Sequence, residues 1–322
     1  MFGCLLLVSG VAGAADPPAA ADRPRLPAQL VADLHGAFGE HRARAVHAKG
    51  VILEGRFTPD PDARTLTTAT LFTAGVPIIV RFSDFTGLPD IPDTSGGASP
   101  RGMAIKFLMP DGSAMDIVAH SFNGFPVARS AEFSTLLQAI AASGSGVAKP
   151  TPLDAFLVSH PAARTFLTTQ KPAPVSWATS AYFGVNALAF IDAGGQAHHV
   201  RYRFVPEAGE HQLGDAALKA SLPDYLAPEI RARVARGPIR FAWYAQLAET
   251  GDPIDDPSIA WPESRRLVRL GTLTIDRLGD DNVVADRALA FMPGNLPPGI
   301  AIADPMLSIR NAAYPISFHE RQ

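Results

Sequence analysis

An arginine and a tyrosine lie four residues apart near the C-terminal end, in the stretch ADPMLSIRNAAYPISF, residues 303–318. On a helix, Arg310 and Tyr314 would share one face, a single turn apart. The guanidinium could then donate a charge-assisted hydrogen bond to the phenolic oxygen. Asp304 can cap the start of this helix, and Pro315 is expected to stop it just after the tyrosine. From this segment alone, a surface pair of modest energetic value is the simplest interpretation.

Histidines are the other candidates for chemistry. His47 lies beside Val46 at the end of the stretch RARAVHAKG, residues 42–50. An imidazole can move protons near neutral pH, although a single histidine at the boundary of an element is more often structural. His198 and His199 are adjacent, and successive strand residues face opposite sides, so they cannot jointly bind one metal without a bulge. The sequence contains neither a G-x-S-x-G nor an H-E-x-x-H motif.

Composition narrows the class of protein. The 322 residues are 47% hydrophobic, enough to build one large domain or two small ones. The net charge is −3 and no basic run occurs, so neither nucleic acid nor an anionic membrane is an expected partner. The single cysteine, Cys4, lies in an N-terminal apolar stretch. A mature chain without it would have no disulfides, cysteine nucleophile, cysteine-bound metal cluster or thiolate-ligated haem.

The N-terminus predicts export. Residues 4–11 form an apolar core, and small residues follow it around Ala14. This pattern is typical of a cleavable signal over residues 1–15, which would place the mature protein in the periplasm. The alternative is a poorly ordered apolar tail. Residues 16–27 are rich in proline and alanine and predict a lead-in, and residues 28–322 are expected to form a single domain.

The remaining segments predict a mixed fold. Helical spacing of apolar residues occurs in residues 28–41, 131–143 and 211–237. Short β-branched or aromatic runs predict strands in residues 49–58, 68–75, 76–85, 101–112, 114–121, 182–206, 239–249 and 265–278. In the segment 182–206, the DAGG sequence predicts a hairpin turn. We therefore expect an α+β fold with an antiparallel barrel of about eight strands and helices packed around it. A barrel of this size can enclose a small ligand.

Five segments carry a resemblance to a known family. They are RARAVHAKG, VRFSDFTG, PRGMAIKF, MDIVAHSFNGFPV and DPMLSIRNAAY, and they occur in this order along the chain. Their order and approximate spacing resemble those of the haem catalase family, over residues 26 to 322. The likeness is to the minimal, exported catalase-related peroxidases, so the additional C-terminal domains of larger catalases are expected to be missing.

The resemblance implies a role for the opening pair. Tyr314 would be the axial ligand of the iron in haem b, held as a phenolate by the nearby cation Arg310. Asp304 would orient the guanidinium from behind. On the opposite haem face, His47 would accept the proton of a bound peroxide and return it to the leaving oxygen. Ser83 would fix the tautomer and ring plane of that imidazole.

Further positions correspond to haem contacts in the family. Three arginines would pair with the haem propionates, whose carboxylates suit guanidinium forks. Two phenylalanines would pack near the haem, and Val46 would contact it. The residues concerned are Arg44, Arg81, Arg321, Phe125 and Phe133.

Two departures from the family are expected. An asparagine of the distal pocket is replaced by His120, or by Ser121 if the alignment slips by one residue. A histidine that supports the proximal arginine is expected to be replaced by Arg203 or Tyr202. The first change leaves peroxide cleavage possible and puts fast dismutation of hydrogen peroxide in doubt.

The function that the resemblance implies is a haem peroxidase with little catalase activity. It would reduce hydrogen peroxide or an organic hydroperoxide with a small organic electron donor, as a monomer or homodimer without a nucleic-acid or membrane partner. Three alternatives remain open at this point. They are an enzyme that rearranges hydroperoxides, a non-catalytic haem-binding barrel, and a haem-free lipid-binding barrel.

Overall fold

Eight antiparallel strands form a closed barrel at the centre of the molecule. The computed structural model describes residues 25–169, 172–280 and 283–322. Neighbouring strands follow the order β4-β3-β2-β1-β8-β7-β6-β5, and a β4–β5 pairing closes the ring. The strands are β1 (Gly50–Pro59), β2 (Val76–Ser83), β3 (Gly102–Leu108), β4 (Ala114–His120), β5 (Tyr182–Ile191), β6 (Ala197–Pro206), β7 (Ile239–Leu247) and β8 (Leu267–Leu278). A short ninth strand, β9 (Ile300–Ile302), pairs with β5.

Aromatic side chains fill the barrel. Trp243 stacks on Phe107 at 5.3 Å between ring centroids and meets Phe57 at 5.4 Å and Tyr202 at 5.1 Å. These rings come from four strands, because alternate residues of each strand point inward. Tight hairpins join several neighbours, and in the β5–β6 turn the Asp192 carboxylate accepts the N–H groups of Gly194 and Gln196. The expected DAGG hairpin is therefore confirmed.

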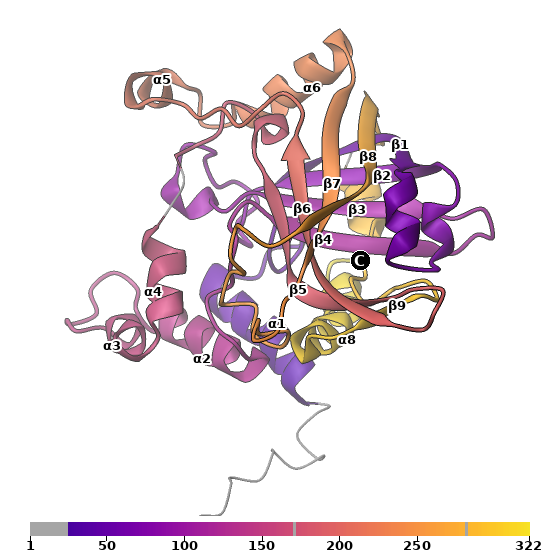
Figure 1. Cartoon of the computed structure of the whole chain (residues 1–322). Helices are drawn as coiled ribbons and strands as arrows, with labels where there is room; N and C mark the ends of the chain where they lie inside the picture. The colour runs from indigo at the N-terminus through magenta and orange to yellow at the C-terminus, as the bar shows by residue number, and fades with distance from the viewer. Residues whose placement is uncertain (1–24, 170–171, 281–282) are drawn as a thin grey trace, which may run out of the picture.

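Helices cover the outside of the barrel. In Figure 1, α1, α2 and α8 lie together below the strands, α3 and α4 extend to the lower left, and α5 and α6 lie at the top. The helices are α1 (Arg25–Phe38), α2 (Ser130–Ala141), α3 (Pro152–Ser159), α4 (Pro161–Thr168), α5 (Asp215–Ala220), α6 (Leu226–Arg236), α7 (Val283–Ala288) and α8 (Pro305–Glu320). The expected α+β barrel with surrounding helices is confirmed.

The predicted strand at residues 68–75 is wrong. The segment instead contains a 3-10 turn, η2 (Thr70–Phe72), in which Phe72 N–H donates to the Ala69 carbonyl at 3.1 Å. Leu71 and Phe72 are both buried. A strand would have pointed these neighbours to opposite faces, whereas the turn directs both toward the core. Phe72 contacts Phe190 and Trp243 and so belongs to the same buried core as the barrel's aromatic rings.

Two helix boundaries also differ from expectation. Pro315 does not stop the last helix, because α8 continues through it to Glu320. Packing of Ala313 and Ile316 against Val31 of α1 supports this second half despite the N–H that proline lacks. At the other end of the chain, α1 begins at Arg25, inside the predicted lead-in of residues 16–27. The predicted signal lies outside the described residues.

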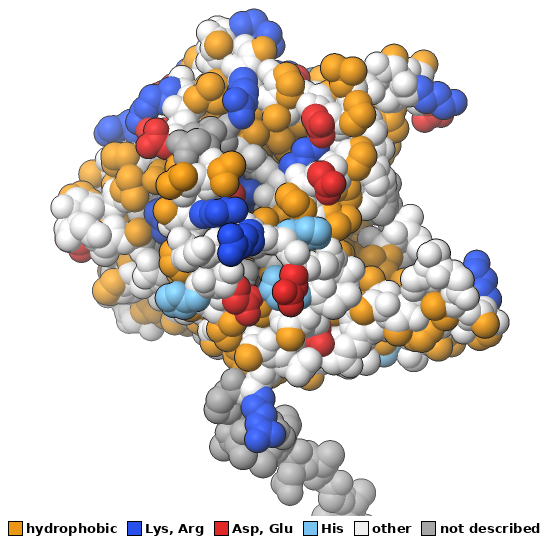
Figure 2. Space-filling view, turned by 180° about the vertical axis from the view of Figure 1, so that it is seen from behind, with side chains coloured by type: hydrophobic (Ala, Val, Ile, Leu, Met, Phe, Trp, Pro, Cys, Tyr) orange, Lys and Arg blue, Asp and Glu red, His pale blue; other side chains and the backbone are white. Residues whose placement is uncertain are grey.

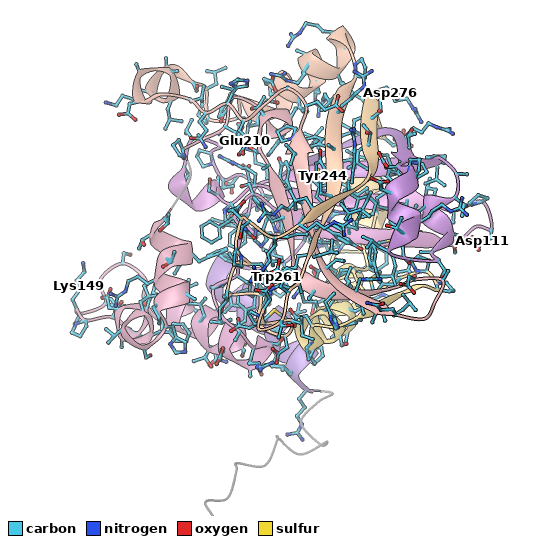
Figure 3. The ribbon with its side chains drawn as sticks, in the orientation of Figure 1. Asp111, Lys149, Glu210, Tyr244, Trp261 and Asp276 are labelled. Atoms are coloured by element: carbon cyan, nitrogen blue, oxygen red, sulfur yellow. The ribbon has the colours of Figure 1, made fainter. Side chains whose placement is uncertain are left out.

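Charged groups of both signs are scattered over the surface. Figure 2 shows lysine and arginine side chains interspersed with aspartate and glutamate over the face opposite to that of Figure 1. In Figure 3, Asp111 marks the tip of the β3–β4 turn at the outer edge of the barrel, where its carboxylate accepts the Ser113 N–H at 2.9 Å. Among the described residues, no helix has both the length and the apolar content needed to span a bilayer.

Candidate active site

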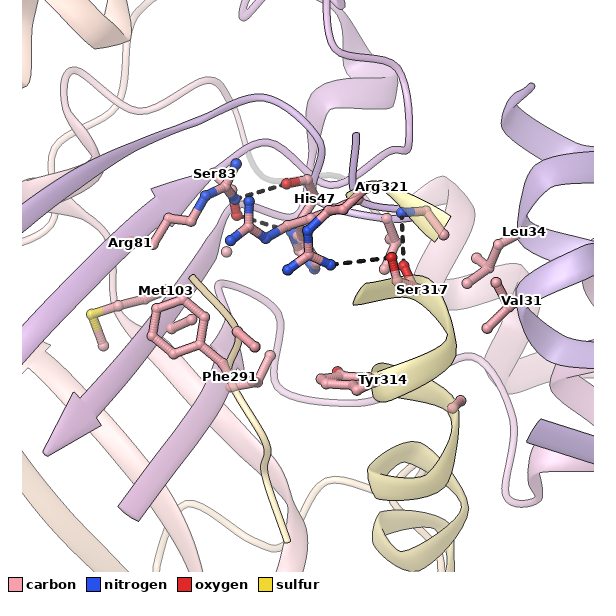
Figure 4. A pocket seen from close by; sticks show the side chains of 18 of the residues that line it. Val31, Leu34, His47, Arg81, Ser83, Met103, Phe291, Tyr314, Ser317 and Arg321 are labelled. Carbon is pink, nitrogen blue, oxygen red and sulfur yellow. Dashed lines mark hydrogen bonds between the residues drawn. The ribbon is translucent and has the colours of Figure 1, made fainter. Parts of the chain in front are cut away.

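One cavity lies between the barrel wall and helices α1 and α8. Its volume is about 770 Å³ when the space of the open mouth is included. Most of its wall is apolar, and the polar groups are few. The lining residues that matter below are Arg44, Val46, His47, Arg81, Ser83, Gly102, Met103, Phe291, Tyr314 and Arg321. In Figure 4, Tyr314 lies on one side of this space and His47 on the other.

Helix α8 presents the tyrosine to the cavity. Asp304 caps this helix by accepting the Met306 N–H at 2.9 Å, and Pro305 occupies its first turn, as the sequence predicted. The guanidinium of Arg310 donates from Nη2 to Tyr314 Oη at 2.7 Å. The predicted helical pair is confirmed, and it aims a permanent positive charge at the phenolic oxygen.

Asn186 supports this arginine from behind. Arg310 Nη1 donates to Asn186 Oδ1 at 2.5 Å, and Asn186 Nδ2 donates to Asp304 Oδ2 at 2.7 Å. Burial raises the pKa of the Asp304 carboxyl above its usual value, although the bond from Asn186 opposes this effect. Asp304 therefore reaches Arg310 through a neutral amide and not directly.

The predicted support of Arg310 by Arg203 is wrong. Arg203 forms a bidentate pair with Glu263, at 2.5 and 3.0 Å, and donates to Gln246 at 3.2 Å. Tyr202 does approach the region, because it lines a smaller hollow together with Arg310 and Asn186. The polar partner of the arginine is nevertheless Asn186, on β5.

His47 lies on the opposite wall, in a segment fixed by its main chain. Its N–H donates to the Phe85 carbonyl at 3.0 Å, and Ala48 N–H donates to the Thr86 carbonyl at 3.0 Å. The φ angle of His47 is +58°, a left-handed conformation that is uncommon for residues other than glycine, although histidine adopts it more often than most. Such backbone outliers concentrate at functional sites, where surrounding bonds hold them in place.

The tautomer of His47 follows from its contacts. Nδ1 lies 3.0 Å from the Asp84 carbonyl oxygen and 3.0 Å from Ser83 Oγ. A carbonyl oxygen can only accept, so Nδ1 carries the hydrogen and Nε2 keeps its lone pair. The expected Ser83–His47 contact is thus present. Burial, followed by His120 and Arg81, lowers the pKa of His47 to about 3, so the imidazole is a neutral proton acceptor at neutral pH.

Three neighbouring strands place a second histidine near the first. Ser83 of β2 pairs with Gly102 of β3, and Gly102 pairs with His120 of β4. Paired residues in a sheet point to the same face, so these positions form one row. A Cβ at Gly102 would lie 2.6 Å from Nδ1 of His47, so the ring occupies the space that the glycine leaves. His120 is buried and lies outside the set of residues that line the cavity.

His120 has one unused nitrogen. Its Nδ1 accepts the Phe122 N–H at 3.4 Å, so Nε2 carries the hydrogen, and Nε2 has no partner among the described residues. Burial, with a contribution from Arg310, lowers the pKa of His120 to about 3. His120 is therefore a neutral hydrogen-bond donor close to the site.

Three arginines gather on one wall of the cavity around a single carboxylate. Asp286 Oδ2 accepts from Arg44 Nη1 at 2.5 Å and Asp286 Oδ1 accepts from Arg81 Nε at 2.6 Å. Arg321 binds the Leu289 carbonyl at 3.0 Å, which Arg44 also binds. Burial would raise the pKa of Asp286, yet Arg81 and Arg44 together hold it below its usual value.

The positive charge on this wall exceeds the negative charge. Burial and the neighbouring Arg81 lower the pKa of Arg44 to about 8, and burial lowers the pKa of Arg321 to about 10. Three guanidinium groups line this wall and its one carboxylate pairs with two of them, so two positive charges are left over. A ligand with two carboxylates would balance them.

Phe125 and Phe133 do not line the cavity. They contact each other at 5.0 Å between ring centroids and belong to an apolar cluster under α2, α3 and α4. Val46, in contrast, is part of the cavity wall.

The residues present fit a haem. The cavity has apolar walls, a tyrosine oxygen held by a cation on one side, an imidazole lone pair on the other, and an excess of two positive charges at its rim. These features match a flat apolar ring system with a ferric ion at its centre and two carboxylates at its edge. Tyr314 would hold the iron, and Arg44, Arg81 and Arg321 would hold the carboxylates.

Sequence reasoning missed Asn186 and Asp286. Asn186 is a lone polar residue in a strand that is otherwise apolar, and a buried amide of this kind requires hydrogen-bond partners. A single polar residue in an apolar strand could therefore have identified Asn186 from the sequence. Asp286 lies on α7, a helix of six residues with no buried side chain, and no sequence pattern marks it.

Comparisons with known proteins were consistent with this geometry. The sequence matches the family model described as Catalase over residues 32–321. It is 32% identical to a catalase-related peroxidase of Synechococcus elongatus, covering 92% of this chain and 88% of the relative. It is 35% identical to a catalase-related peroxidase of Mycolicibacterium paratuberculosis, covering 90% of this chain and 93% of the relative.

Solved structures show the same fold at lower identity. A bacterial catalase superposes with a TM-score of 0.74 at 22% identity, covering 98% of this chain and 63% of the other. A fungal catalase gives a TM-score of 0.75 at 20% identity, covering 87% of this chain and 59% of the other.

Proposed function

This chain belongs to the catalase family, and from that premise we propose that it is a haem-dependent peroxidase. It reduces hydrogen peroxide or a small organic hydroperoxide and takes electrons from an external organic donor, with little dismutation of hydrogen peroxide. The observation that carries the proposal is the placement of the His47 lone pair and the Arg310-bound Tyr314 oxygen on opposite sides of one apolar cavity.

In the proposed reaction, the protein's own residues transfer a proton. His47 Nε2 accepts a proton from a peroxide in the cavity and returns it to the oxygen that leaves as water. Ser83 and the Asp84 carbonyl keep Nδ1 protonated, so Nε2 stays available in each cycle. Haem, when bound, would supply the iron and the two electrons that reduce the O–O bond, and the external donor would restore those electrons.

On the other side of the cavity, the positive charge of Arg310 stabilises the oxygen of Tyr314, the proposed iron ligand. Arg310 donates to Tyr314 Oη and favours its phenolate form, because an opposite charge within hydrogen-bond distance stabilises an anion. We assign haem b as the cofactor, since its two propionates match the two unbalanced positive charges at the rim. His120, where the family resemblance implies an asparagine, supports peroxidase activity over dismutation.

The proposal is tested with protein reconstituted with haem b. Wild type should oxidise a dye donor in a peroxide-dependent reaction, and Tyr314→Phe should lose the phenolate-to-iron charge-transfer absorption. If wild type consumed no peroxide in the presence of donor, the proposal would be overturned. Conversion of a lipid hydroperoxide without any donor would instead identify a rearranging enzyme.

Location and assembly belong to the same proposal. The apolar core and small residues within positions 1–15 support export to the periplasm, and the mature enzyme is proposed to be a monomer or homodimer. Cell fractionation with N-terminal sequencing of the mature chain tests the first point. Light scattering of the haem-loaded protein tests the second.

A further inference from the structure

Phe166 is the centre of a group of aromatic rings on the side of the barrel covered by α4. Its ring lies 5.7 Å from Phe85, 6.1 Å from His120, 5.2 Å from Phe122 and 6.3 Å from Phe125, measured between centroids. These separations are those of rings in contact. Phe166 is 5% exposed, whereas its neighbours Arg164 and Thr165 on the same helix are exposed.

This ring contacts one histidine of the site directly and the other through Phe85. Phe85, which Phe166 touches, meets the His47 imidazole edge-on at 5.4 Å. His120 touches Phe166 directly, and its Nε2 has no partner among the residues that the structure describes. On α4 only Ala163 and Phe166 are buried, so the cover that this helix provides over the histidines is the Phe166 ring.

The approach from α4 is separate from the main cavity. That cavity is bounded by α1, α8 and residues near Phe291, and it is the space that the proposed function gives to haem. On the α4 side, Phe166 packs against Phe122 and against Phe85, which meets the His47 ring, so a peroxide that approached His47 from this side would have to pass these rings.

We propose that Phe166 determines which peroxides reach His47, because its ring covers the approach to the two histidines from α4. This inference rests on the proposed peroxidase function. A ring in contact with four others must be displaced before a molecule can pass, and the displacement grows with the size of the molecule. Hydrogen peroxide therefore passes more readily than a branched organic hydroperoxide.

The first test measures selectivity in the haem-loaded enzyme. Phe166→Ala should raise the ratio of kcat/KM for cumene hydroperoxide to kcat/KM for hydrogen peroxide by about tenfold or more, the scale of discrimination by apolar pockets. Phe156→Ala is the matched control. Phe156 belongs to the apolar cluster under α3 and stacks on His160 at 3.7 Å, away from the two histidines of the site. An unchanged ratio, or an equal rise in both variants, would overturn the proposal.

The second test needs neither haem nor turnover. Diethyl pyrocarbonate modifies accessible neutral imidazoles, and peptide mass spectrometry reports the modification of each histidine. His120 should be modified at least about fivefold faster in Phe166→Ala than in wild type. The exposed His211 serves as the internal reference and should be modified at one rate in all variants.

Two further variants guard against misfolding. Phe166→Leu keeps a large apolar side chain and should give an intermediate rate of His120 modification, and Phe166→Trp should lower it below wild type. Rates of His120 modification that do not follow side-chain size would overturn the covering role. If those rates do follow size while peroxide selectivity is constant, Phe166 covers His120 without filtering substrate, and the proposal is wrong. If wild type has no peroxidase activity, the proposed function fails while the covering role stands.

Discussion

Asn186 accepts a hydrogen bond from Arg310 at 2.5 Å, and so a neutral amide occupies the position nearest to the arginine on the side away from Tyr314. The carboxylate of Asp304 lies one hydrogen bond further away, beyond Asn186 Nδ2. Among the described residues the guanidinium therefore has no direct ion-pair partner, and its charge acts on the tyrosine oxygen at 2.7 Å. This arrangement determines how strongly Tyr314 can donate electron density to a metal.

Asn186→Asp tests that relationship. A carboxylate next to Arg310 neutralises its charge, so the phenolate of Tyr314 becomes a stronger electron donor and favours ferric iron. The midpoint potential of the haem-loaded protein should fall by roughly 50 mV, close to the 59 mV of a tenfold change in a one-electron equilibrium. Spectroelectrochemical titration measures it. Gln246→Glu places the same charge beside Arg203 and should leave the potential near wild type.

His47→Gln removes the proton acceptor while keeping a side chain that can fill the site. Positioned general acid–base groups contribute about 10²- to 10⁴-fold, so the rate of peroxide cleavage should fall by at least about 10²-fold. Haem content should remain near wild type. Stopped-flow spectroscopy of the haem with hydrogen peroxide measures the rate. His198→Gln, which removes an imidazole paired with Asp192, is the control, and equal losses in both variants would argue against the role of His47.

Several parts of the fold could be predicted from the sequence for a simple physical reason. Arg310 and Tyr314 are one helical turn apart, so a local pattern was sufficient to predict their bond. Short runs of β-branched and aromatic residues likewise predicted β1 to β8, and the turn chemistry of residues 192–195 predicted a hairpin. The strand predicted at residues 68–75 failed because tertiary packing of Phe72 against the barrel interior outweighed its local β preference.

Contacts between distant segments could not be predicted in the same way. The Arg310–Asn186 bond joins residues 124 positions apart, and the Asp286–Arg44 bond joins residues 242 positions apart. Nothing local to residue 286 shows that α7 meets the arginines of the cavity wall. Arg203 was a reasonable candidate for supporting Arg310, but in the folded chain it pairs with Glu263, which lies 60 positions away in the loop before β8.

Gly102→Ala should impair the site although it replaces no reacting group. The added Cβ would lie 2.4 Å from Ser83 Oγ and 2.6 Å from His47 Nδ1, so one of these groups must move. We expect a loss of about 1–3 kcal/mol in the free energy of unfolding, as for other overpacked cores. The rate of peroxide cleavage should fall by about tenfold or more as His47 leaves its place. Urea unfolding and stopped-flow kinetics measure the two effects.

Gly144→Ala is the matched control for this substitution. Its Cβ would have no atom within 4 Å, so neither stability nor rate should fall appreciably. Wild-type kinetics in Gly102→Ala would show that the His47 ring does not depend on the space left by the glycine.

The buried imidazole of His120 should make the free energy of unfolding depend on pH. Burial, followed by the charge of Arg310, lowers its pKa from 6.5 to about 3 in the folded chain. Between these values the unfolded chain binds a proton on this imidazole and the folded chain does not. The stability that the neutral imidazole of His120 contributes is therefore fully present above pH 6.5 and is lost as the pH falls toward 3.

His120→Gln binds no proton in either state, so its free energy of unfolding should fall less steeply with acid, by up to about 1.4 kcal/mol per pH unit near pH 5. Urea titrations at several pH values between 7 and 4.5 measure the difference, with the exposed His211→Gln as control. Parallel curves for wild type and His120→Gln would mean that the imidazole at position 120 is already protonated inside the folded protein.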